Sequence, residues 1–589
     1  MTIIAVRHSG FGIPLLALAT LAVAGCTPDH DPQLNGGPVP PITGSLPQPP
    51  TARKSILFTE VTDRSGVAWT VQNGEEAGLY TILESFGAGC AIDDFDGDGK
   101  VDLFFGGGGK FGPKQEILPL PIALYRQLST WKFFPVTGPA GLHPIRHYHH
   151  GVWTADTDED GFPDLLITGW EGLQLFRNQG DGTFDDATER SGLTSDHLWS
   201  VAAGWADLNQ DQVLDLFVGH YVDWSFSNNP VCFDTRRGQQ NICDPTRFQG
   251  LPCTVFLGNG DGTYRDASSE LGIHDVGKTL GVVIADLNGD DRPDIYVAND
   301  TLPNQLYELQ PSGTYRDVSI ENGVALGESN TADGSMGVDL GDLDGDGKPD
   351  LWVANYENQT FALYRNLGND LFTHASRAFG VTAVGANAVG FGTVIFDADG
   401  DGLSDIFCAN GHIWAPSMTI DRRQVPYLFR NEECRRLQNI APLAGDYMAS
   451  RHLGRGAATS DFDFNGSPDL VVTHTNEPVA LLRNDTEIPN WFSLRLIGRH
   501  SPRCAIGAKV ELVTGNRRQL GFVKGGASYL STSDRALLFG LGPAASVDTL
   551  LIHWPSGQKT RLTNLPPNQR LQVIEPPLTV KDAPHAAMR

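Results

Sequence analysis

The chain has 589 residues, which is long for one ordinary hydrophobic core but suits a repeat architecture, in which each unit packs on its neighbours. Its 70 Asp and Glu residues exceed its 43 Lys and Arg residues, and the formal net charge is −27. A charge of this sign repels nucleic-acid phosphates and anionic lipid head groups, so we expect no nucleic-acid partner. The acidic residues recur in short clusters between apolar stretches, which argues against disorder.

The first 53 residues have the composition of a secretion signal followed by a tether. Arg7 and His8 precede an apolar stretch over residues 11–24 that is too short to span a membrane. The stretch ends in Leu21-Ala22-Val23-Ala24-Gly25-Cys26, which resembles a bacterial lipobox. The resemblance implies a signal peptide over residues 1–25 and a lipid on Cys26. An ordinary signal peptide with an incidental Cys is the alternative.

A Pro/Gly-rich tether is predicted over residues 26–53. Under this interpretation the protein is extracytoplasmic, lies in the cell envelope and touches the membrane only through its lipid anchor. Thr27 stands where an Asp is linked to inner-membrane retention in some bacteria, and this favours the outer membrane.

One pattern, Asp-x-[Asp/Asn]-x-[Asp/Asn]-x-x-x-Asp followed by an apolar run, recurs seven times. The starts lie 51 to 79 residues apart, a spacing suited to propeller blades. In chain order the sets are Asp94, Asp96, Asp98 and Asp102; Asp156, Asp158, Asp160 and Asp164; Asp207, Asn209, Asp211 and Asp215; Asp286, Asn288, Asp290 and Asp294; Asp342, Asp344, Asp346 and Asp350; Asp397, Asp399, Asp401 and Asp405; and Asp461, Asp463, Asn465 and Asp469.

The spacing suits Ca²⁺, which takes six to eight oxygen ligands at about 2.3–2.6 Å. Positions 1, 3 and 5 present alternate side chains, and a carbonyl near position 7 and the carboxylate at position 9 would complete the shell. Position 6 is Gly in five loops, which permits the sharp turn, but it is Gln212 in the third loop and Asp291 in the fourth. We expect the third site to be the weakest, and the fourth loop has Gly289 as another turn residue. The alternative is a set of Asp-rich turns without metal.

An EF-hand would need a Glu at position 12 and helices on both sides of the loop. Position 12 is apolar in all seven loops, and the flanking residues alternate or run apolar as strands do. We therefore expect each loop to join two β-strands.

The rest of each repeat predicts a four-stranded blade. A small residue, such as Gly89 or Ala202, lies five positions before the first Asp and suits an inner strand near a crowded axis. A second strand follows the last Asp, and a third reads like Leu175-Phe176-Arg177-Asn178. Outer strands of the first six repeats are predicted near Phe134, Phe184, Tyr264, Tyr315, Phe372 and Leu437.

The seventh repeat lacks its fourth strand after Asn484, and the missing pattern appears early in the chain, over residues 58–62. A ring that closes with this segment has no free edges. The fold prediction is therefore all-β: a seven-bladed propeller over residues 54–489, followed by a small C-terminal β-rich domain.

The repeats resemble FG-GAP/VCBS repeats, the calcium-loop blades also found in integrin α-subunit heads. The chain from Trp491 resembles the ASPIC/UnbV domain, and the residues that carry this resemblance are 501–510, 525–531, 539–542 and 554–557. The combination is similar to bacterial relatives of the cartilage acidic protein family. The resemblance implies a domain over residues 490–576 with a tail over 577–589. Cys504 stands where that family usually has an acidic or polar residue, and it could pair with Cys434.

A candidate ligand-binding rim follows the second strands. Five residues past each final Asp, or beside that position, lie His220, Asn299, Asp300, Asn355, Glu357, Asn410, His412 and His474. Propeller geometry would gather them on one rim, and loops on a rigid scaffold often carry function. The alternative is that the Asn and His side chains cap the turns at the strand ends.

Two further clusters have an open role. His143, His147, His149 and His150 could bind a transition metal or could form an ordinary loop. Of Cys232, Cys243 and Cys253, we expect two to pair in an oxidising compartment, and a metal site is the alternative. The insertion over residues 221–253 is either a partner-binding loop or a structural flap held by the disulfide. Cys90 and Cys408 lie in apolar strand patterns and are expected to be buried.

The sequence contains no Gly-x-Ser-x-Gly, His-Glu-x-x-His or P-loop motif. We expect a calcium-stabilised envelope lipoprotein that binds a protein or glycan ligand, as an adhesion or interaction module. The alternative is an enzyme or enzyme accessory with its active site on the rim or in the central channel, since the UnbV name is associated with biosynthetic gene clusters. A convergent His, Asp and Arg set in the channel would favour the enzyme, and a dry or narrow channel would favour binding.

Overall fold

The computed structural model describes residues 55–195, 197–233, 238–413 and 421–578. The predicted signal peptide, Cys26 and the tether lie outside these residues, so their predictions stay untested. In the described part of the chain, no helix combines the length and apolar character needed to cross a bilayer. The α-helices are single turns of four residues: α1 Thr62–Ser65, α2 Ser268–Leu271, α3 Ser319–Asn322 and α4 Asp446–Ala449.

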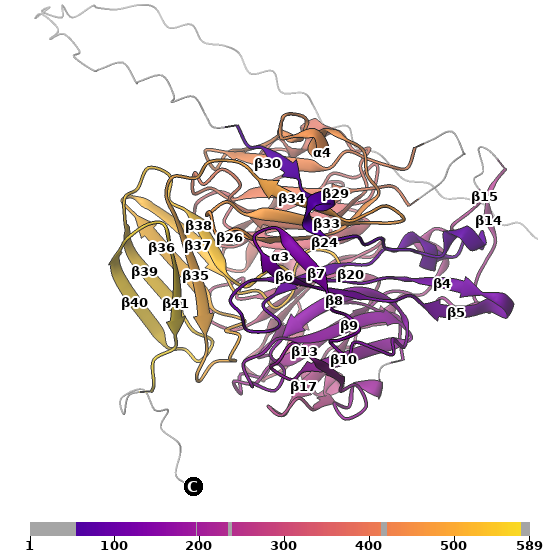
Figure 1. The fold of residues 1–589 in the computed structure, drawn as a ribbon. Coiled ribbons are helices and arrows are strands. Elements are labelled where there is room, and N and C mark those ends of the chain that lie inside the picture. Colours follow the sequence, from indigo (N-terminus) through magenta and orange to yellow (C-terminus); the bar gives the residue numbers. More distant parts are fainter. Residues whose placement is uncertain (1–54, 196, 234–237, 414–420, 579–589) are drawn as a thin grey trace, which may run out of the picture. The chain divides into compact units, whose positions relative to one another are not determined.

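Between residues 58 and 484 the described chain forms seven four-stranded antiparallel sheets, which we call blades 1 to 7 (Figure 1). The inner strands are β2 Cys90–Asp93, β8 Tyr148–Ala155, β12 Ser200–Ala206, β20 Thr279–Ala285, β24 Ser335–Gly341, β28 Gly390–Phe396 and β32 Gly454–Ser460. The second strands are β3 Asp102–Phe105, β9 Asp164–Trp170, β13 Asp215–His220, β21 Asp294–Asn299, β25 Asp350–Asn355, β29 Asp405–Asn410 and β33 Asp469–His474. Each aspartate loop joins the first two strands of its blade, as predicted.

The outer half of each blade follows the predicted motifs. The third strands are β6 Ala123–Ser129, β10 Gly172–Asn178, β17 Thr254–Gly258, β22 Gln305–Leu309, β26 Ala362–Gly368, β30 Tyr427–Glu432 and β34 Ala480–Asn484. The fourth strands are β7 Lys132–Pro135, β11 Phe184–Asp186, β18 Tyr264–Asp266, β23 Tyr315–Asp317, β27 Leu371–His374, β31 Arg436–Asn439 and, for blade 7, β1 Phe58–Glu60. The all-β prediction is confirmed.

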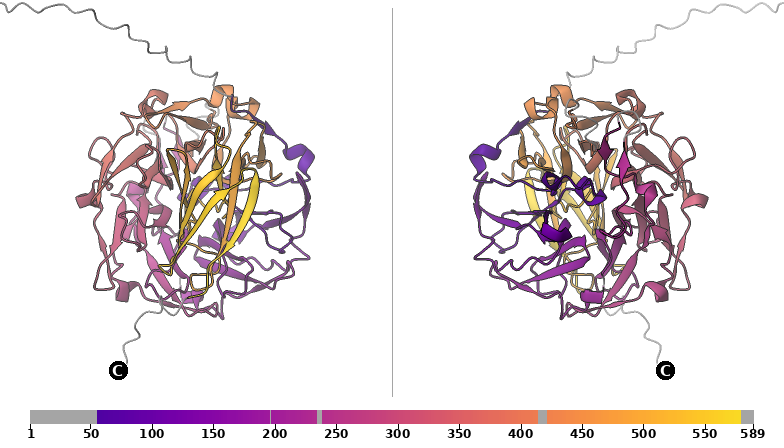
Figure 2. Two further views of the ribbon diagram at one scale, coloured as in Figure 1. Left: turned by 90° about the vertical axis from the view of Figure 1, so that its left-hand side faces the viewer. Right: turned by 90° about the vertical axis from the view of Figure 1, so that its right-hand side faces the viewer.

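The inner strands contact one another in the order β2, β8, β12, β20, β24, β28, β32 and again β2. The blades therefore stand around one axis, as both views of Figure 2 show. In blade 7, β1 pairs with β34 and places Phe58 opposite Asn484. Apolar side chains fill the space between neighbouring blades; Phe104 of blade 1, for example, shares a buried cluster with Val152 and Leu165 of blade 2.

Several short strand pairs and 3₁₀ turns lie in the connections between the blade strands. They are the hairpin β4 Gly109–Gly112 with β5 Glu116–Pro119, the pair β14 Cys232–Phe233 with β15 Gln240–Asn241, the pair β16 Leu251–Pro252 with β19 Val276–Gly277, and the 3₁₀ turns η1 Glu75–Ala77, η2 Ile82–Ser85, η3 Pro113–Gln115, η4 Leu193–Ser195, η5 Pro245–Arg247, η6 Val381–Val384 and η7 Ala441–Leu443. A disulfide between Cys232 and Cys243 joins β14 to the chain just after β15.

The C-terminal chain forms two further sheets that share a buried core. One has the order β38-β35-β41, with β35 and β41 parallel, and the other has the order β37-β36-β39-β40. The strands are β35 Trp491–Ile497, β36 Lys509–Thr514, β37 Arg517–Phe522, β38 Leu537–Gly540, β39 Val547–His553, β40 Lys559–Leu565 and β41 Gln569–Ile574. We call residues 491–574 the C-terminal domain.

A loop of the C-terminal domain, residues 524–535, enters the central channel of the propeller. Its carbonyl groups accept hydrogen bonds from inner strands of different blades: Leu530 O from Val152 N at 3.0 Å, and Thr532 O from Ile92 N at 3.0 Å. The Leu530 side chain is fully buried, with an exposed fraction of 0%. A Cβ atom on Gly89 would lie 1.6 Å from Leu530 O. A side chain at position 89, directly before β2, would therefore clash with the inserted loop, and Gly89 avoids this clash.

The channel is also filled from the opposite face. Phe86, directly after η2, packs with ring centroids 5.0 Å from Trp199 and 5.2 Å from Tyr221. These rings belong to the same buried cluster as Tyr529 and Leu530 of the inserted loop. In the described residues, packed side chains, most of them apolar, fill the middle of the channel.

Candidate metal sites in the aspartate loops

All seven aspartate loops are held by the same two hydrogen bonds. The backbone N–H at position 6 donates to the carboxylate at position 1, at 2.8–3.2 Å. The N–H at position 2 donates to the carboxylate at position 9, at 2.8–3.3 Å. The first and last aspartates therefore fold the loop around the side chains between them.

Position 6 has a positive φ in every loop, between 61° and 101°. Gly occupies it in five loops at no steric cost, whereas Gln212 (φ 77°) and Asp291 (φ 61°) adopt it with a side chain. Gly289 of the fourth loop has a φ of 85°, but it stands at position 4, which is left-handed in all seven loops. The idea that Gly289 takes over the turn of position 6 is therefore wrong.

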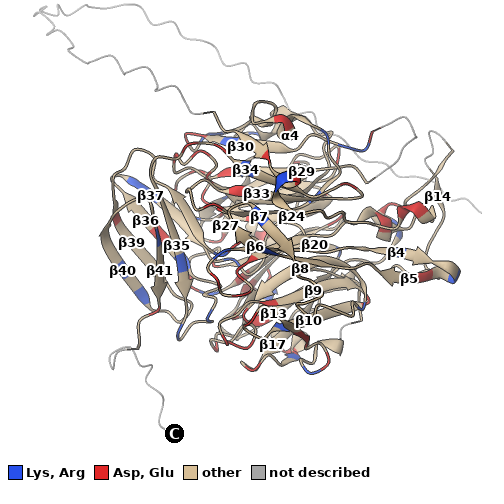
Figure 3. Cartoon of the chain, in the orientation of Figure 1, with Lys and Arg blue, Asp and Glu red and all other residues tan. Residues whose placement is uncertain are grey.

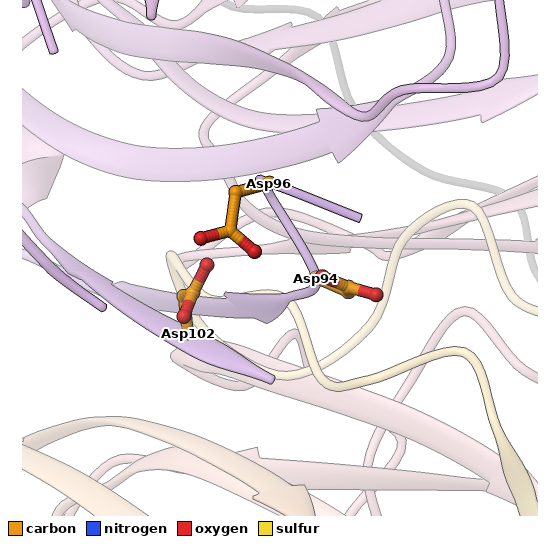
Figure 4. Close-up of side chains that lie close together, drawn as sticks. All are labelled: Asp94, Asp96 and Asp102. Atoms are coloured by element: carbon orange, nitrogen blue, oxygen red, sulfur yellow. The ribbon is translucent and has the colours of Figure 1, made fainter. Parts of the chain in front are cut away.

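Carboxylate oxygens converge in five of the loops. In each, three residues offer oxygens that all lie within 4.8 Å of one another: Asp94, Asp96 and Asp102; Asp156, Asp158 and Asp160; Asp342, Asp344 and Asp350; Asp397, Asp399 and Asp405; and Asp461, Asp463 and Asp469. In the first loop the carboxylates of Asp96 and Asp102 face each other, and Asp94 lies at the end of the inner strand (Figure 4). These five clusters could hold a metal ion.

Burial makes these clusters unfavourable for ionised carboxylates alone. Desolvation and the neighbouring carboxylates raise the pKa of Asp102 to about 8 and that of Asp156 to about 7. Asp397 is half-buried, and the same two causes raise its pKa well above the usual range. A cation in the loop would reverse the direction of each shift.

Buried oxygens without a hydrogen-bond partner test whether a metal fits. In the described residues, Asp156 Oδ1, Asp397 Oδ1 and Asp463 Oδ1 are buried and accept no hydrogen bond. A buried acceptor of this kind loses its hydration without compensation unless it binds a donor or a cation. An all-oxygen donor set in a tight loop fits a hard divalent cation such as Ca²⁺.

The third and fourth loops differ from the other five. Each has Asn at position 3, and Asn209 Nδ2 donates to Asp211 Oδ2 at 2.8 Å. Neither loop brings three acidic side chains together, although Asp207 and Asp215 are still buried, which raises their pKa to about 6 and 7. Both loops lack a third converging carboxylate, so the prediction that the third site binds metal most weakly stays untested.

An arginine of the third strand, predicted only as part of a strand motif, faces the position 3 carboxylate. Arg126 pairs with Asp96, Arg177 with Asp158 and Arg365 with Asp344. The strand register places Leu257 and Glu308 at the same position in blades 3 and 4, where position 3 is Asn. In these three blades the arginine accompanies the additional carboxylate, and Leu-x-Arg in the third strand was the signal for it.

The predicted ligand rim is mostly interior. All five predicted residues at the strand ends are buried: His220, Asn299, Asn355, Asn410 and His474. The side chains of Asn299, Asn355 and His474 bond to the turns after their second strands. Asn299 Nδ2, for example, donates to Pro303 O at 2.9 Å, and Asn410 Nδ2 donates to Val425 O at 2.8 Å. The capping interpretation therefore describes Asn299, Asn355 and His474, whereas His220 and Asn410 bond to more distant strands and loops, and none of the five lies on an exposed rim.

The remaining rim candidates are partly exposed and have partners. Tyr221 Oη donates to Asp300 Oδ2 at 2.6 Å, and His412 Nε2 lies 3.2 Å from Glu357 Oε2. The four-His cluster does not converge among the described residues: His149 Nε2 accepts from Gly107 N at 2.8 Å, whereas His150 packs on Phe86.

The cysteines follow the predictions with one exception. Cys232 and Cys243 form the disulfide, and Cys253 keeps a free, buried thiol, as do Cys90 and Cys408. Cys434 and Cys504 are both free thiols, so the suggested pair between them is absent.

The aspartate loops lie on the propeller face that carries the C-terminal domain. Side chains of this domain lie against the position 6 glycines: Arg503 against Gly161, Arg518 against Gly347 and Arg517 against Gly402. Asp93, just before the first loop, pairs with Arg495 and Arg535. Figure 3 shows acidic loops in the propeller and basic residues on the strands of the C-terminal domain. The C-terminal domain therefore supplies positive charge close to the loops.

Two family models match the chain. The FG-GAP-like repeat matches residues 94–167, 156–218, 252–297, 286–353 and 342–408, and the ASPIC and UnbV model matches residues 498–579. The repeat matches span most of the aspartate loops, and the second match spans all but the first strand of the C-terminal domain.

Curated relatives carry one name, cartilage acidic protein 1. The protein of Xenopus tropicalis is 26% identical over 86% of this chain and 74% of its own length, and the protein of Homo sapiens is 27% identical over 60% of this chain and 54% of its own length. The chain thus spans about half of the human protein.

Among solved structures, an Agrocybe aegerita lectin that recognises non-reducing terminal N-acetylglucosamine is 16% identical, with a TM-score of 0.37 over 62% of this chain and 89% of its own. The exotype rhamnogalacturonan lyase YesX is 10% identical, with a TM-score of 0.30 over 79% of this chain and 75% of its own. Neither likeness says anything of a ligand. Together, the family matches show that this chain carries FG-GAP-like repeats and a C-terminal ASPIC and UnbV domain, and that it is similar to cartilage acidic protein 1.

Proposed function

We propose that the chain is a calcium-stabilised interaction module of the cell envelope. The proposal that calcium binds rests on the convergence of carboxylates in the aspartate loops. Several buried oxygens of these carboxylates have no hydrogen-bond donor in the described part of the protein. Ca²⁺ would remove the repulsion between these carboxylates and join the first and second strands of a blade at the loop. The ion acts here as a structural element.

A binding role follows from the filled channel. Tyr529 and Leu530 enter it from one face and Phe86 from the other, and Arg455 donates to the carbonyl oxygens of Gly411 and Gly454. This packing supports the binding role over an active site in the middle of the channel, because side chains already occupy that space. A protein or glycan ligand would then meet the loops and insertions on the outer surface.

The envelope location rests on the lipobox-like residues before Cys26. Incorporation of labelled palmitate into the full-length protein, and its loss in Cys26→Ser, tests the anchor. The binding role is tested by screening the lipid-free chain, from Thr27 onward, against glycans and envelope proteins in calcium and in EDTA. Binding that needs calcium supports the proposal, whereas turnover of a screened compound, with no stable complex, would contradict it.

A further inference from the structure

A cavity of about 690 Å³ opens on the propeller face away from the C-terminal domain. This is the side on which β4, β5, β14 and β15 project in Figure 1. Its volume lies within the range of small-ligand sites in proteins, roughly 300–1,000 Å³. The lining residues used below are Glu75, Glu76, Tyr80, Glu84, Asn241 and Arg422.

The walls come from distant parts of the chain and are fixed by hydrogen bonds. Arg422 donates to both oxygens of Glu75 at 2.9 Å, which joins η1 to the chain after blade 6's second strand. Asn476 Nδ2 donates to Asn73 Oδ1 at 2.9 Å and ties the same segment to blade 7. The cavity is therefore built from elements that hold their positions without a ligand.

The cavity carries negative charge. Glu75 is neutralised by Arg422, but Glu76 and Glu84 have no cation of their own among the described residues. Glu84 Oε1 accepts from Thr81 N at 3.0 Å, and the side chain is only 5% exposed. Burial and the neighbouring Glu75 and Glu76 raise the pKa of Glu84 to about 7. A ligand with positive charge would favour its ionised form.

A second observation concerns Asn241, which is 5% exposed and lines the cavity from β15. Its Oδ1 accepts from Ile242 N at 2.8 Å, which fixes the orientation of the amide. Its Nδ2 is buried and has no hydrogen-bond partner in the described part of the chain. An unused buried donor is unfavourable, and an acceptor atom on a ligand would satisfy it.

We propose that this cavity binds a small primary ammonium compound that carries a hydroxyl or carbonyl oxygen near its ammonium group. The ammonium group would lie by Glu84 and Glu76, and the oxygen would accept from Asn241 Nδ2. The ring of Tyr80 is 39% exposed at the mouth and offers an apolar face to the ligand. An amino sugar and a lysine residue of a partner protein both present this chemistry. The site lies apart from the aspartate loops, and the inference does not depend on calcium there.

Isothermal titration of the lipid-free chain, in calcium buffer at pH 7.5, tests the inference with glucosamine and Nα-acetyl-lysine amide as separate probes. N-acetylglucosamine is the control ligand, because it keeps the ring but loses the cation. We expect at least one amine to bind roughly tenfold or more tightly than N-acetylglucosamine, a difference of about 1.4 kcal/mol. Binding of glucosamine alone assigns an amino sugar, and binding of the lysine derivative alone assigns a protein partner.

Two variants locate the bound amine. Glu76 is exposed, so Glu76→Gln should fold, and we expect it to weaken amine binding several-fold. Glu116→Gln removes the same charge from an exposed position outside the cavity lining and should leave binding unchanged. Equal effects of the two variants, equal binding of glucosamine and N-acetylglucosamine, or no binding of either amine would overturn the inference.

Discussion

Asn178 of blade 2 binds the aspartate loop of blade 1: its Nδ2 donates to Phe95 O, the position 2 carbonyl of that loop, at 2.8 Å. The same amide donates to Pro163 O in its own blade, and Asn178 N donates to Asp164 Oδ1. One side chain thus links the candidate metal sites of two neighbouring blades.

The same link recurs around the propeller. The position 2 carbonyl of a loop accepts from the next blade through Asn366 Nδ2 to Leu287, Asn431 Nδ2 to Leu343, Asn484 Nδ2 to Ala398, Gln127 Nε2 to Phe462 and Tyr315 Oη to Leu208. The Gln127 bond runs from blade 1 to blade 7. A change in the conformation of one loop should therefore alter the hydrogen bonding of the neighbouring blade.

Replacing Asn178 by Ala should lower the free energy of unfolding by about 1–3 kcal/mol, because two buried carbonyl groups lose their donor. Asn259→Ala is the matched control, since Asn259 is exposed and its side chain donates only to Thr263 Oγ1 among the described residues. Urea unfolding of both variants provides the comparison. An Asn178→Ala protein as stable as the control would refute the structural role of this link.

Gly89→Ala should displace the loop of residues 524–535 from the channel, because the added Cβ atom would lie 1.6 Å from Leu530 O. We expect faster proteolysis within that loop and a lower melting temperature. Gly138→Ala has no atom within 4 Å of its added Cβ atom and serves as the control. Proteolysis patterns that do not differ between the two variants would contradict the insertion.

Glu84 makes stability depend on pH in a predictable direction. Its pKa of about 7 in the folded protein exceeds the ordinary 4.5, so the folded state holds the proton more tightly than the unfolded state. The free energy of unfolding should therefore fall as pH rises from about 4.5 through 7, by up to about 3 kcal/mol from this group. Thr81, Glu75 and Glu76 are the groups around it that contribute to the shift.

Glu84→Gln removes this ionisation and keeps an acceptor for Thr81. Urea unfolding at pH 5 and pH 8 should show that the variant gains stability relative to the unsubstituted protein as pH rises. The same pH dependence in both proteins would mean that Glu84 ionises as freely as in the unfolded chain.

Asp397→Asn should have opposite effects without and with calcium. In EDTA it removes a buried carboxylate whose pKa is raised well above its usual range, so the variant should be as stable as the unsubstituted protein or more stable. In calcium it should bind one ion fewer and show a smaller rise in melting temperature. Asp370→Asn, at an exposed position outside the loops, should change neither quantity. A normal ion count in Asp397→Asn would exclude Asp397 as a ligand.

The local patterns of the sequence predict much of the fold. The Asp spacing marked every loop between β-strands, and Leu-Phe-Arg-Asn marked third strands such as β10, because both signals lie within a few residues. The early segment at Phe58 was recognisable because it repeats the outer-strand pattern and finds its partner at Asn484.

The insertion of residues 524–535 could not be predicted in this way. The contact between Gly89 and Leu530 joins residues far apart in sequence, and crowding of the inner strands alone would already favour a small residue near a propeller axis. The prediction of an exposed ligand rim was wrong for a related reason, because position at a strand end says nothing of burial. Asn299 turns inward to cap a local turn, and Asn410 is buried and donates to Val425 O. The cavity at Glu84 is lined by residues of η1, blade 7 and β15. Because these segments lie far apart in the sequence, no local sequence pattern predicts the cavity.

Calcium in the aspartate loops is tested by thermal unfolding of the lipid-free chain in calcium and in EDTA, combined with a metal count on the protein after dialysis. We expect a large calcium-dependent rise in melting temperature and at least one ion for each of the five converging clusters, with up to seven if the third and fourth loops also bind. An unchanged melting temperature together with no bound calcium would contradict calcium binding by these loops.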